Sequence, residues 1–531
     1  MRKRIACLCA ALSVLAAPVA ASAETPADQL VIGMSMNNIL TLDPAAITGR
    51  ETTFIATNIY DTLVENHPIE GTRTDPGLAE SWAIDKDGTI TFKLREGATF
   101  ASGNPVTIDD VEWSIKRTIS LGLVGSGFWK MSGYTAENMD KFIRVVNGDL
   151  VVSMAQPDDP KLVLALFGRP DAAAIIDKKE TLAHEKDGDK GAAWLTTEAA
   201  GSGPFVIKRW TANNLMMLDR NEKYWREAPA MKRVIFRHMA ESQTKRLMLQ
   251  KGDIDVGLGL SVPDIKALSE NPDVTVQAVP SAGFYYLAVN MKDERFAKRE
   301  VREALRYLID YEGVNKTVMP NYGVLHQWPV TKNVLGSLKD PGWRLDVPKA
   351  KALLAKAGYP DGFEVELRAL NEPPFLDAAT AIQATLAEAG IKARIVSGTG
   401  NQVYGPMRAR TFEMIVGRGG GGKQLHPDSN LRALVVNPNN ADDAGLSGII
   451  IWRTAFQSEE LNRMAQDALV EKDIDKQRKL YEDLQWRWAD IVSSLQPFSA
   501  VVDTTVFRSD VKGYINHYAF TTRLREVTKA R

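Results

Sequence analysis

The pattern of hydrophobic and polar positions alternates along the chain between the period of a helix and the period of a strand. Apolar residues recur at helical spacing in residues 51–64, 241–252, 299–311, 347–358, 376–389 and 459–491. Alternation or short apolar runs predict strands at residues 30–36, 90–94, 234–238, 284–290, 363–369, 391–396 and 499–507. The succession of strands and helices predicts an α/β protein.

Local signals mark where several of these elements begin. Asp87-Gly88 predicts a hairpin turn before the alternating strand at 90–94. Thr107 predicts a helix start, because its hydroxyl can cap the first turn and two acids, Asp109 and Asp110, follow it. No Gly/Ser-rich or Pro-rich linker divides the chain. Lobes joined by structured segments are therefore expected, which is typical of a hinge.

The first 23 residues predict a cleaved secretory signal. Arg2, Lys3 and Arg4 precede an apolar run over residues 5–20, and Ala21-Ser22-Ala23 forms an A-x-A cleavage site. The apolar run is too short to span a bilayer of about 30 Å. We therefore expect export into a Gram-negative periplasm.

Composition narrows the chemistry of the exported chain. The two cysteines, Cys7 and Cys9, lie inside the signal near the start of its apolar run, so neither a disulfide nor a lipid anchor is expected. Loss of three basic residues leaves 62 Lys and Arg against 66 Asp and Glu, a net charge of −4. No polybasic block occurs, so nucleic acid and anionic membranes are not expected partners.

Catalytic motifs are missing from the sequence. H-E-x-x-H and G-x-S-x-G do not occur, and His184-Glu185 is not followed by a second histidine one helical turn later. A secreted hydrolase is the alternative from another functional class, but we expect no enzyme, no catalytic residue and no cofactor.

A glycine-rich segment is the most unusual stretch. Residues 412–416 predict a strand, and residues 417–430 (GRGGGGKQLHPDSN) its following loop. The stretch from Gly417 to Lys423 fits G-x-x-x-x-G-K, and three of its glycines also fit G-x-G-x-x-G. Both nucleotide motifs require a helix to start there, whereas residues 425–428 predict a turn. Nucleotide binding is therefore not expected.

Six ordered motifs resemble the family 5 extracellular solute-binding proteins, the peptide/nickel/opine class. They are LAESW (78–82) with FKLREGATFASGNPVTIDDVEWSIKR (92–117), GSGPF (201–205), RNEKYW (220–225), LQKGDIDV (249–256), VREALRYLID (301–310) and the segment 350–363. The resemblance covers nearly the whole exported chain.

The resemblance implies a two-lobed Venus-flytrap fold with an inserted subdomain. The expected parts are the signal peptide 1–23, lobe I built from 24–75, 201–287 and 499–531, the inserted subdomain 76–200, and lobe II 288–498. It also implies a monomer that encloses a small ligand and delivers it to inner-membrane ABC permease subunits, which work with cytoplasmic ATPase subunits.

The glycine-rich segment departs from the pattern of that family. Dipeptide-binding members carry an acidic residue there that pairs with the ligand's ammonium group, whereas this chain has glycines, with Arg418 and Lys423 nearby. A buried charge needs a partner. The two cations favour a carboxylate, so the resemblance predicts an anionic peptide or an opine-like conjugate. The alternative is that Arg418 pairs with an acid of the protein.

The candidate ligand-binding residues come from this segment and from scattered polar and aromatic positions. They are Arg418, Gly419, Gly420, Gly421, Lys423, His426, Asp428, Tyr404, Trp129, Arg50, Tyr285 and Trp328. His426 keeps a nickel-chelate binder open as an alternative within the same family, although no metal ligand is assigned. A chaperone or chemoreceptor adaptor with this fold also stays open.

Overall fold

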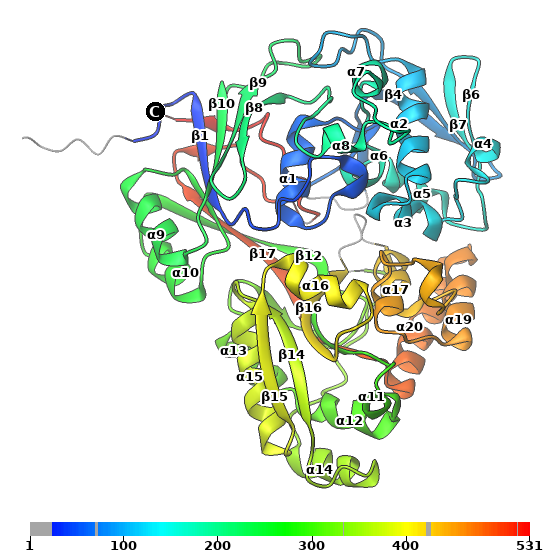
Figure 1. Cartoon of the computed structure of the whole chain (residues 1–531), viewed down its shortest axis with the longest axis vertical. Coiled ribbons are helices and arrows are strands. Elements are labelled where there is room, and N and C mark those ends of the chain that lie inside the picture. The colour runs from blue at the N-terminus through cyan, green and yellow to red at the C-terminus, as the bar shows by residue number, and fades with distance from the viewer. Residues whose placement is uncertain (1–23, 69–72, 333, 421–425, 518, 531) are drawn as a thin grey trace, which may run out of the picture.

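Two long antiparallel strands, β12 (Val274–Val289) and β17 (Leu495–Arg508), join the two halves of the molecule (Figure 1). The computed structural model describes residues 24–68, 73–332, 334–420, 426–517 and 519–530, so the expected signal at 1–23 lies outside the described residues. Both strands lie in an 11-stranded sheet of order β15-β14-β16-β12-β17-β11-β1-β10-β9-β8, with β13 paired to β17.

The upper lobe of Figure 1 surrounds one end of this sheet. Its main elements are β1 (Gln29–Met34), α1 (Arg50–Ile59), β8 (Phe205–Thr211), β9 (Leu215–Arg220), β10 (Arg233–His238), α9 (Ser242–Lys251), β11 (Val256–Leu258) and α10 (Val262–Ser269). Short strand pairs complete it: β2 (Val64–Asn66) with β3 (Thr74–Pro76), and β18 (Val511–Lys512) with β19 (Thr528–Lys529).

The inserted subdomain has a sheet and a hydrophobic core of its own. Its sheet has the order β4-β5-β7-β6. The strands are β4 (Ala79–Ile84), β5 (Ile90–Leu94), β6 (Ile143–Val146) and β7 (Asp149–Val152). The helices are α2 (Ile108–Ser120), α3 (Val124–Met131), α4 (Met139–Phe142), α5 (Pro160–Leu166), α6 (Pro170–Ala173), α7 (Lys178–Ala183) and α8 (Ala192–Leu195). Thr107 caps α2 in a capping box with Asp110, as expected.

The lower lobe surrounds the other end of the long sheet. Its strands are β13 (Gly323–Leu325), β14 (Glu364–Leu370), β15 (Lys392–Gly398) and β16 (Met414–Gly420). Its helices are α11 (Glu294–Ala297), α12 (Arg299–Tyr307), α13 (Tyr311–Thr317), α14 (Val347–Lys356), α15 (Phe375–Glu388), α16 (Gly400–Arg408), α17 (Pro427–Val435), α18 (Ile450–Arg453), α19 (Glu459–Val470) and α20 (Ile474–Ile491). The segment 459–491 thus forms two helices.

The chain passes between the lobes inside strands rather than through loops. Residues 274–280 of β12 pair with the part of β17 that also pairs with β11, whereas residues 283–289 pair with β16 of the lower lobe. The register shifts between Pro280 and Phe284. The divisions expected at 287/288 and 498/499 therefore fall within continuous strands, which are longer than the sequence pattern predicted. The α/β class and the two-lobed arrangement with an inserted subdomain are confirmed.

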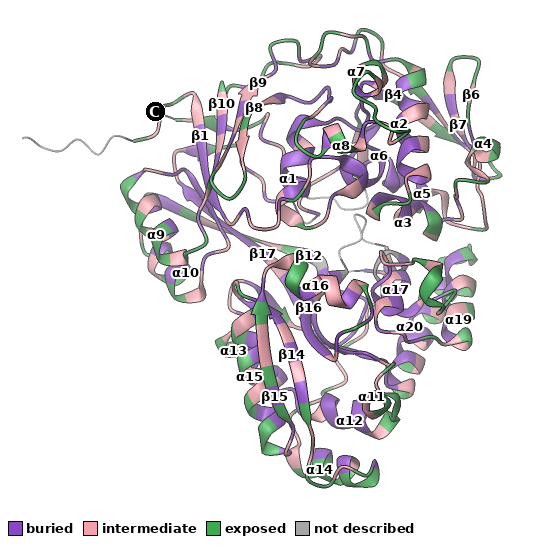
Figure 2. Ribbon diagram, viewed as in Figure 1, coloured by how far each residue is buried: buried purple, intermediate pink, exposed green. Residues whose placement is uncertain are grey.

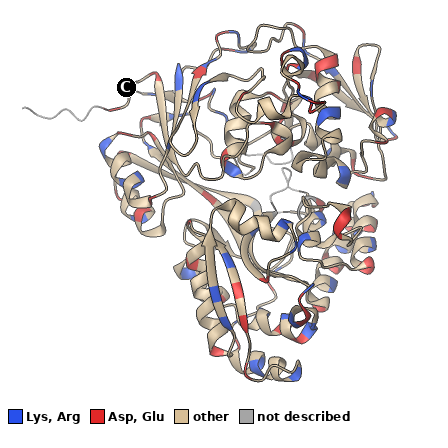
Figure 3. Ribbon diagram, in the orientation of Figure 1, with Lys and Arg blue, Asp and Glu red and all other residues tan. Residues whose placement is uncertain are grey.

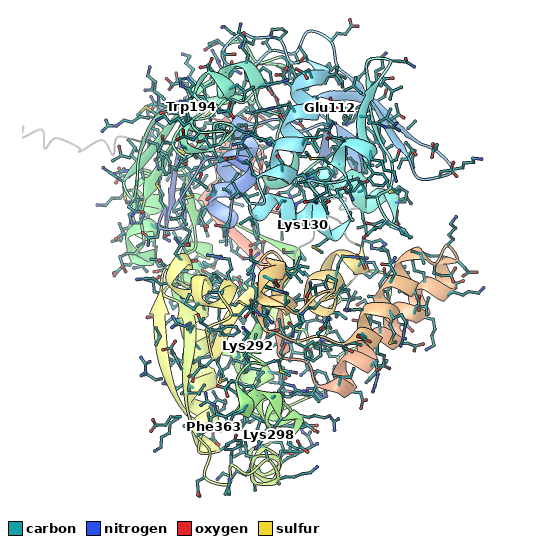
Figure 4. All side chains as sticks on the ribbon, turned by 45° about the vertical axis from the view of Figure 1, so that its right-hand side comes forward. Glu112, Lys130, Trp194, Lys292, Lys298 and Phe363 are labelled. Atoms are coloured by element: carbon teal, nitrogen blue, oxygen red, sulfur yellow. The ribbon has the colours of Figure 1, made fainter. Side chains whose placement is uncertain are left out.

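Burial and charge follow this architecture. Figure 2 shows buried residues along β1, β12, β16 and β17 and exposed ones on peripheral helices such as α14. Basic and acidic residues are interspersed over both lobes (Figure 3). Lys130 lies at the edge of the inserted subdomain that faces the lower lobe, whereas Lys298 and Phe363 lie at the far end of the lower lobe (Figure 4). Within the described residues, no helix combines the length and apolarity that crossing a membrane requires.

The G-S-G-P-F segment brings two backbones together. A Cβ on Gly201 would lie 1.9 Å from the carbonyl oxygen of Ile59 at the end of α1. We expect Gly201→Ala to lower the free energy of unfolding by about 1–3 kcal/mol, because backbone must move to admit the methyl group. Urea unfolding measures this. The control is Gly405→Ala in α16, where a Cβ meets no atom within 4 Å. Equal effects of the two changes would contradict this explanation.

Candidate ligand-binding site

A cavity of about 390 Å³ lies where the upper lobe, the inserted subdomain and the lower lobe meet. Its lining includes the start of α1, Phe128 of α3, Lys245 of α9, Glu372 after β14, and parts of α16, β16 and α18. Because these segments come from all three parts of the molecule, a bound molecule can contact all three at once.

The lobes touch each other around this cavity. The amide of Gly400 donates a hydrogen bond to Asn38 Oδ1 at 2.8 Å, and Gln466 Nε2 donates to the carbonyl of Pro157 at 3.0 Å. These contacts join lower-lobe residues to the upper lobe and to the inserted subdomain. The structure therefore represents a closed arrangement of the lobes.

Positive charge predominates in the lining. Six cationic side chains line the cavity: Arg50, Arg169, Lys245, Arg408, Arg418 and Arg453. The lining carboxylates are Glu51, Asp171 and Glu372, and Asp503 lies directly behind Arg418. With every group ionised, these residues carry a net charge of +2, which favours a negatively charged ligand.

Arg418 of β16 is held by an acid of the protein. Its Nη2 donates to both carboxylate oxygens of Asp503 on β17, at 3.0 Å each. The guanidinium also lies 4.6 Å from the ring centroid of Phe520. Arg50 Nη1 lies 3.8 Å from the same Asp503. One buried carboxylate thus offsets part of the charge of two arginines from opposite lobes.

The positive charges of Arg408 and Arg453 are not offset by a carboxylate in this way. Among the described residues, neither guanidinium has a carboxylate within 4 Å; Arg453 Nε donates to the carbonyl of Ser447 at 2.6 Å, and Arg408 Nη2 to Asn401 Oδ1 at 3.3 Å. Burial and the nearby charge of Arg408 lower the pKa of Arg453 to about 10. Two like charges at one wall of the cavity are costly, and an anion between them removes that cost.

A second group of charges lies on the side of the cavity near α1. Lys245 Nζ donates to the carbonyls of Leu258 and Gly259, at 2.9 and 2.7 Å, and burial lowers its pKa to about 8. Burial, followed by the charge of Glu51, raises the pKa of Glu372 to about 7. Burial also raises the pKa of Glu51, whose carboxylate lies 3.6 Å from Arg50 Nε.

Comparison with known protein families identifies the chain. Residues 73–442 match the model of the bacterial extracellular solute-binding proteins, family 5. The chain belongs to this family. Family 5 is a family of solute-binding proteins and not of enzymes.

Known proteins are similar to this family 5 protein over almost the entire length of both chains. The chain is 26% identical to the probable D,D-dipeptide-binding periplasmic protein DdpA of Escherichia coli strain K12, over 93% of each chain. Its fold matches the periplasmic binding protein DppA of Helicobacter pylori in complex with peptide STSA (TM-score 0.84, 23% identity, 95% and 98% of the chains covered). It also matches MoaA of A. tumefacien R10 in complex with mannopinic acid (TM-score 0.83, 21% identity, 95% and 100% covered).

Five of the residues expected to bind ligand in this family 5 protein line the cavity, namely Arg50, Tyr285, Tyr404, Arg418 and Gly419. Tyr404 Oη accepts a hydrogen bond from the amide of Arg418 at 3.2 Å. Trp129 and Trp328 lie instead in hydrophobic cores, and neither is exposed. Their indole groups donate to the carbonyls of Ala172 and Lys339, so the protein's own backbone accepts these hydrogen bonds.

The glycine-rich segment differs from the expected loop. Residues 417–420 continue strand β16, and Gly420 pairs with Gly283 of β12. A Cβ on Gly417 would lie 2.7 Å from the ring of Tyr286, so this glycine makes room for an aromatic neighbour. Gly421 and Lys423 lie outside the described residues. The turn expected at 425–428 is corrected too, because helix α17 begins at Pro427.

His426 and Asp428 belong to the start of α17 and are not part of the cavity lining. His426 Nδ1 accepts a hydrogen bond from the amide of Asp428, which makes it the N-cap, and Asp428 pairs with Arg432 one turn later at 2.7 Å. Within the described part of the chain, no group of three or more His, Cys, Asp or Glu side chains is placed to hold a metal ion.

Sequence reasoning missed six charged residues of the cavity: Glu51, Arg169, Asp171, Lys245, Glu372 and Arg453. They lie on different segments, separated by up to about four hundred residues of sequence. Glu51 directly follows Arg50, and Glu372 follows a predicted strand, but neither position has a motif. Only the folded arrangement brings them together.

The raised pKa of Glu372 predicts how the stability of the ligand-free protein depends on pH. The folded state retains a proton that the unfolded chain loses near pH 4.5, so this group lowers stability as pH rises from about 4.5 to 7. We expect Glu372→Gln to leave the melting temperature unchanged at pH 4.5 and to raise it at pH 8. Thermal unfolding of ligand-free protein measures both. Glu388→Gln, at an exposed position of α15, is the control. An equal change at both pH values would contradict the expectation.

Proposed function

We propose that the protein is the periplasmic solute-binding component of an ABC importer and that it captures a peptide-like or opine-type solute with an acidic group. Family membership and the names of the relatives, which include peptide-binding and opine-binding proteins, support solute capture. The acidic group is inferred from this chain's own residues.

The inference that the ligand is anionic rests on the pair Arg408 and Arg453. Both guanidiniums line the cavity without a carboxylate within 4 Å among the described residues. A guanidinium can hold a carboxylate through two parallel hydrogen bonds. Arg418, the residue that first indicated an anion, already has Asp503 as its partner. We therefore assign anion binding to Arg408 and Arg453.

Binding works by stabilising the closed arrangement. Ligand in the cavity contacts both lobes only when they are closed, so its binding free energy shifts the population toward that state. The Asn38–Gly400 hydrogen bond joins the two lobes in this structure and contributes to that state. The closed protein then docks on the membrane permease, and a separate cytoplasmic subunit hydrolyses ATP. Export through the signal at 1–23 is part of this proposal.

A thermal-shift screen of protein refolded without ligand tests the function. The panel contains acidic dipeptides, neutral dipeptides, mannopinic acid and a nickel–histidine complex. A ligand at about 100 times its Kd adds about 2.7 kcal/mol of stability. We expect shifts with the acidic members. A shift with nickel–histidine alone, or with neutral dipeptides alone, would overturn the anionic assignment, and no shift at all would overturn solute capture of this class.

A further inference from the structure

We propose that Glu372 binds a charged amine of the ligand, so that the solute is a zwitterion held between Glu372 and the Arg408–Arg453 pair. This inference rests on the proposed function and deepens it. It assigns the amine to an element that the sequence did not single out, in place of the acid that the glycine-rich segment lacks.

Glu372 is positioned by the turn between β14 and α15. The amide of Phe375 donates a hydrogen bond to the Glu372 carbonyl at 3.0 Å, and residues 370–375, apart from Asn371, line the cavity with it. β14 lies next to β16, which carries Arg418. The carboxylate therefore extends from the lower lobe on a short turn that is held between a strand and a helix.

The cations near Glu372 are already engaged elsewhere. Arg418 is paired with Asp503 through two hydrogen bonds, and Lys245 donates to two carbonyls. Arg50 lies between Glu51 at 3.6 Å and Asp503 at 3.8 Å. Among the described residues, no Lys, Arg or His nitrogen lies within 4 Å of the Glu372 carboxylate. A largely buried carboxylate with no such partner is costly unless a cation is supplied from outside.

Glu51 strengthens this preference for a cation. Its negative charge is, after burial, the largest influence that keeps Glu372 protonated. Two carboxylates that repel each other across a cavity are both stabilised by one cation between them. An ammonium or secondary amine of the ligand is such a cation, whereas a neutral amide is not.

One ligand can reach both charged ends. Glu372, Tyr404, Arg408 and Arg453 all line the same cavity. Arg408 is on the same helix as Tyr404, α16, four residues later. The cavity of about 390 Å³ has room for a molecule of dipeptide size, which can therefore contact the acidic and the basic groups together.

Calorimetric titration with Ala-Glu, N-methyl-Ala-Glu and N-acetyl-Ala-Glu tests the inference. The first two carry a charged amine, and the third carries a neutral amide of similar bulk. We expect the wild-type protein to bind both amines at least about tenfold more tightly than the amide, since a charge-assisted hydrogen bond is lost. Glu372→Gln should bring all three within about twofold of one another by weakening the two amines. Glu364→Gln on β14, whose side chain is 84% exposed, should retain the preference.

The possible failures are distinguishable. If the wild-type protein binds the amide as tightly as the amines, or if Glu372→Gln weakens all three equally, the amine site is overturned and the anionic ligand is not. If none of the three binds the wild-type protein, the proposed acidic peptide-like solute is overturned, and the amine site with it.

Discussion

Replacing Arg408 and Arg453 together by glutamine is expected to weaken binding of acidic dipeptides by at least about 100-fold. Removing a partly buried cation from a hydrogen-bonded charge pair costs about 2–5 kcal/mol, and about 2.7 kcal/mol already corresponds to 100-fold. Calorimetric titration of each variant measures the loss. The fold is expected to persist, because burial and mutual repulsion destabilise these charges without ligand.

Arg394→Gln is the matched control for this change. Arg394 is 73% exposed on β15 and pairs with Glu366, outside the cavity lining. Its replacement should leave affinity within about twofold, as exposed ion pairs contribute little. Unchanged affinity in the double variant, with the fold verified by circular dichroism, would show that these arginines do not hold the ligand.

Asp503→Asn is expected to lower the free energy of unfolding by about 3 kcal/mol. Asp503 is buried, accepts two hydrogen bonds from Arg418 and lies near Arg50, so its loss leaves two arginines without their shared anion. Urea unfolding of ligand-free protein measures the loss. Chloride or sulfate should restore part of the stability, because an anion can replace the missing carboxylate.

Glu460→Gln provides the comparison for Asp503. Glu460 also holds an arginine through two contacts of 2.9 Å, to Arg487, but its side chain is 44% exposed. Its loss should cost no more than about 1 kcal/mol. Similar losses in the two variants would mean that burial of Asp503 does not set its contribution.

The fold could largely be predicted from the sequence, since it rests on local signals. The capping box at Thr107, the hairpin at Asp87-Gly88 and the helical periods at 347–358 and 376–389 all correspond to observed elements. The lengths of β12 and β17 could not be predicted. Each strand contains a proline, Pro280 in β12 and Pro497 in β17, which argues against a continuous strand in the sequence, and pairing with distant strands continues both past it.

The site could be predicted only in part. Arg50, Tyr404 and Arg418 drew attention because they adjoin recognisable turns or the glycine-rich segment. Arg453 and Glu372 have no such neighbours. Their importance depends on the lack of an opposite charge within 4 Å in the part of the chain that the structure describes, which no sequence reveals. The prediction that Trp129 and Trp328 bind ligand was wrong for a physical reason. The indole N–H of a large aromatic side chain can donate to a backbone carbonyl as well as to a ligand.

The most direct test of the anionic site compares Ala-Glu with Ala-Gln on ligand-free wild-type protein. The two peptides share size, backbone and both terminal charges, and differ by one side-chain carboxylate. With Arg408 and Arg453 both available, calorimetric titration should give at least about tenfold tighter binding of Ala-Glu. Equal binding of the two peptides, or tighter binding of Ala-Gln, would contradict the assignment of this cavity to an acidic solute.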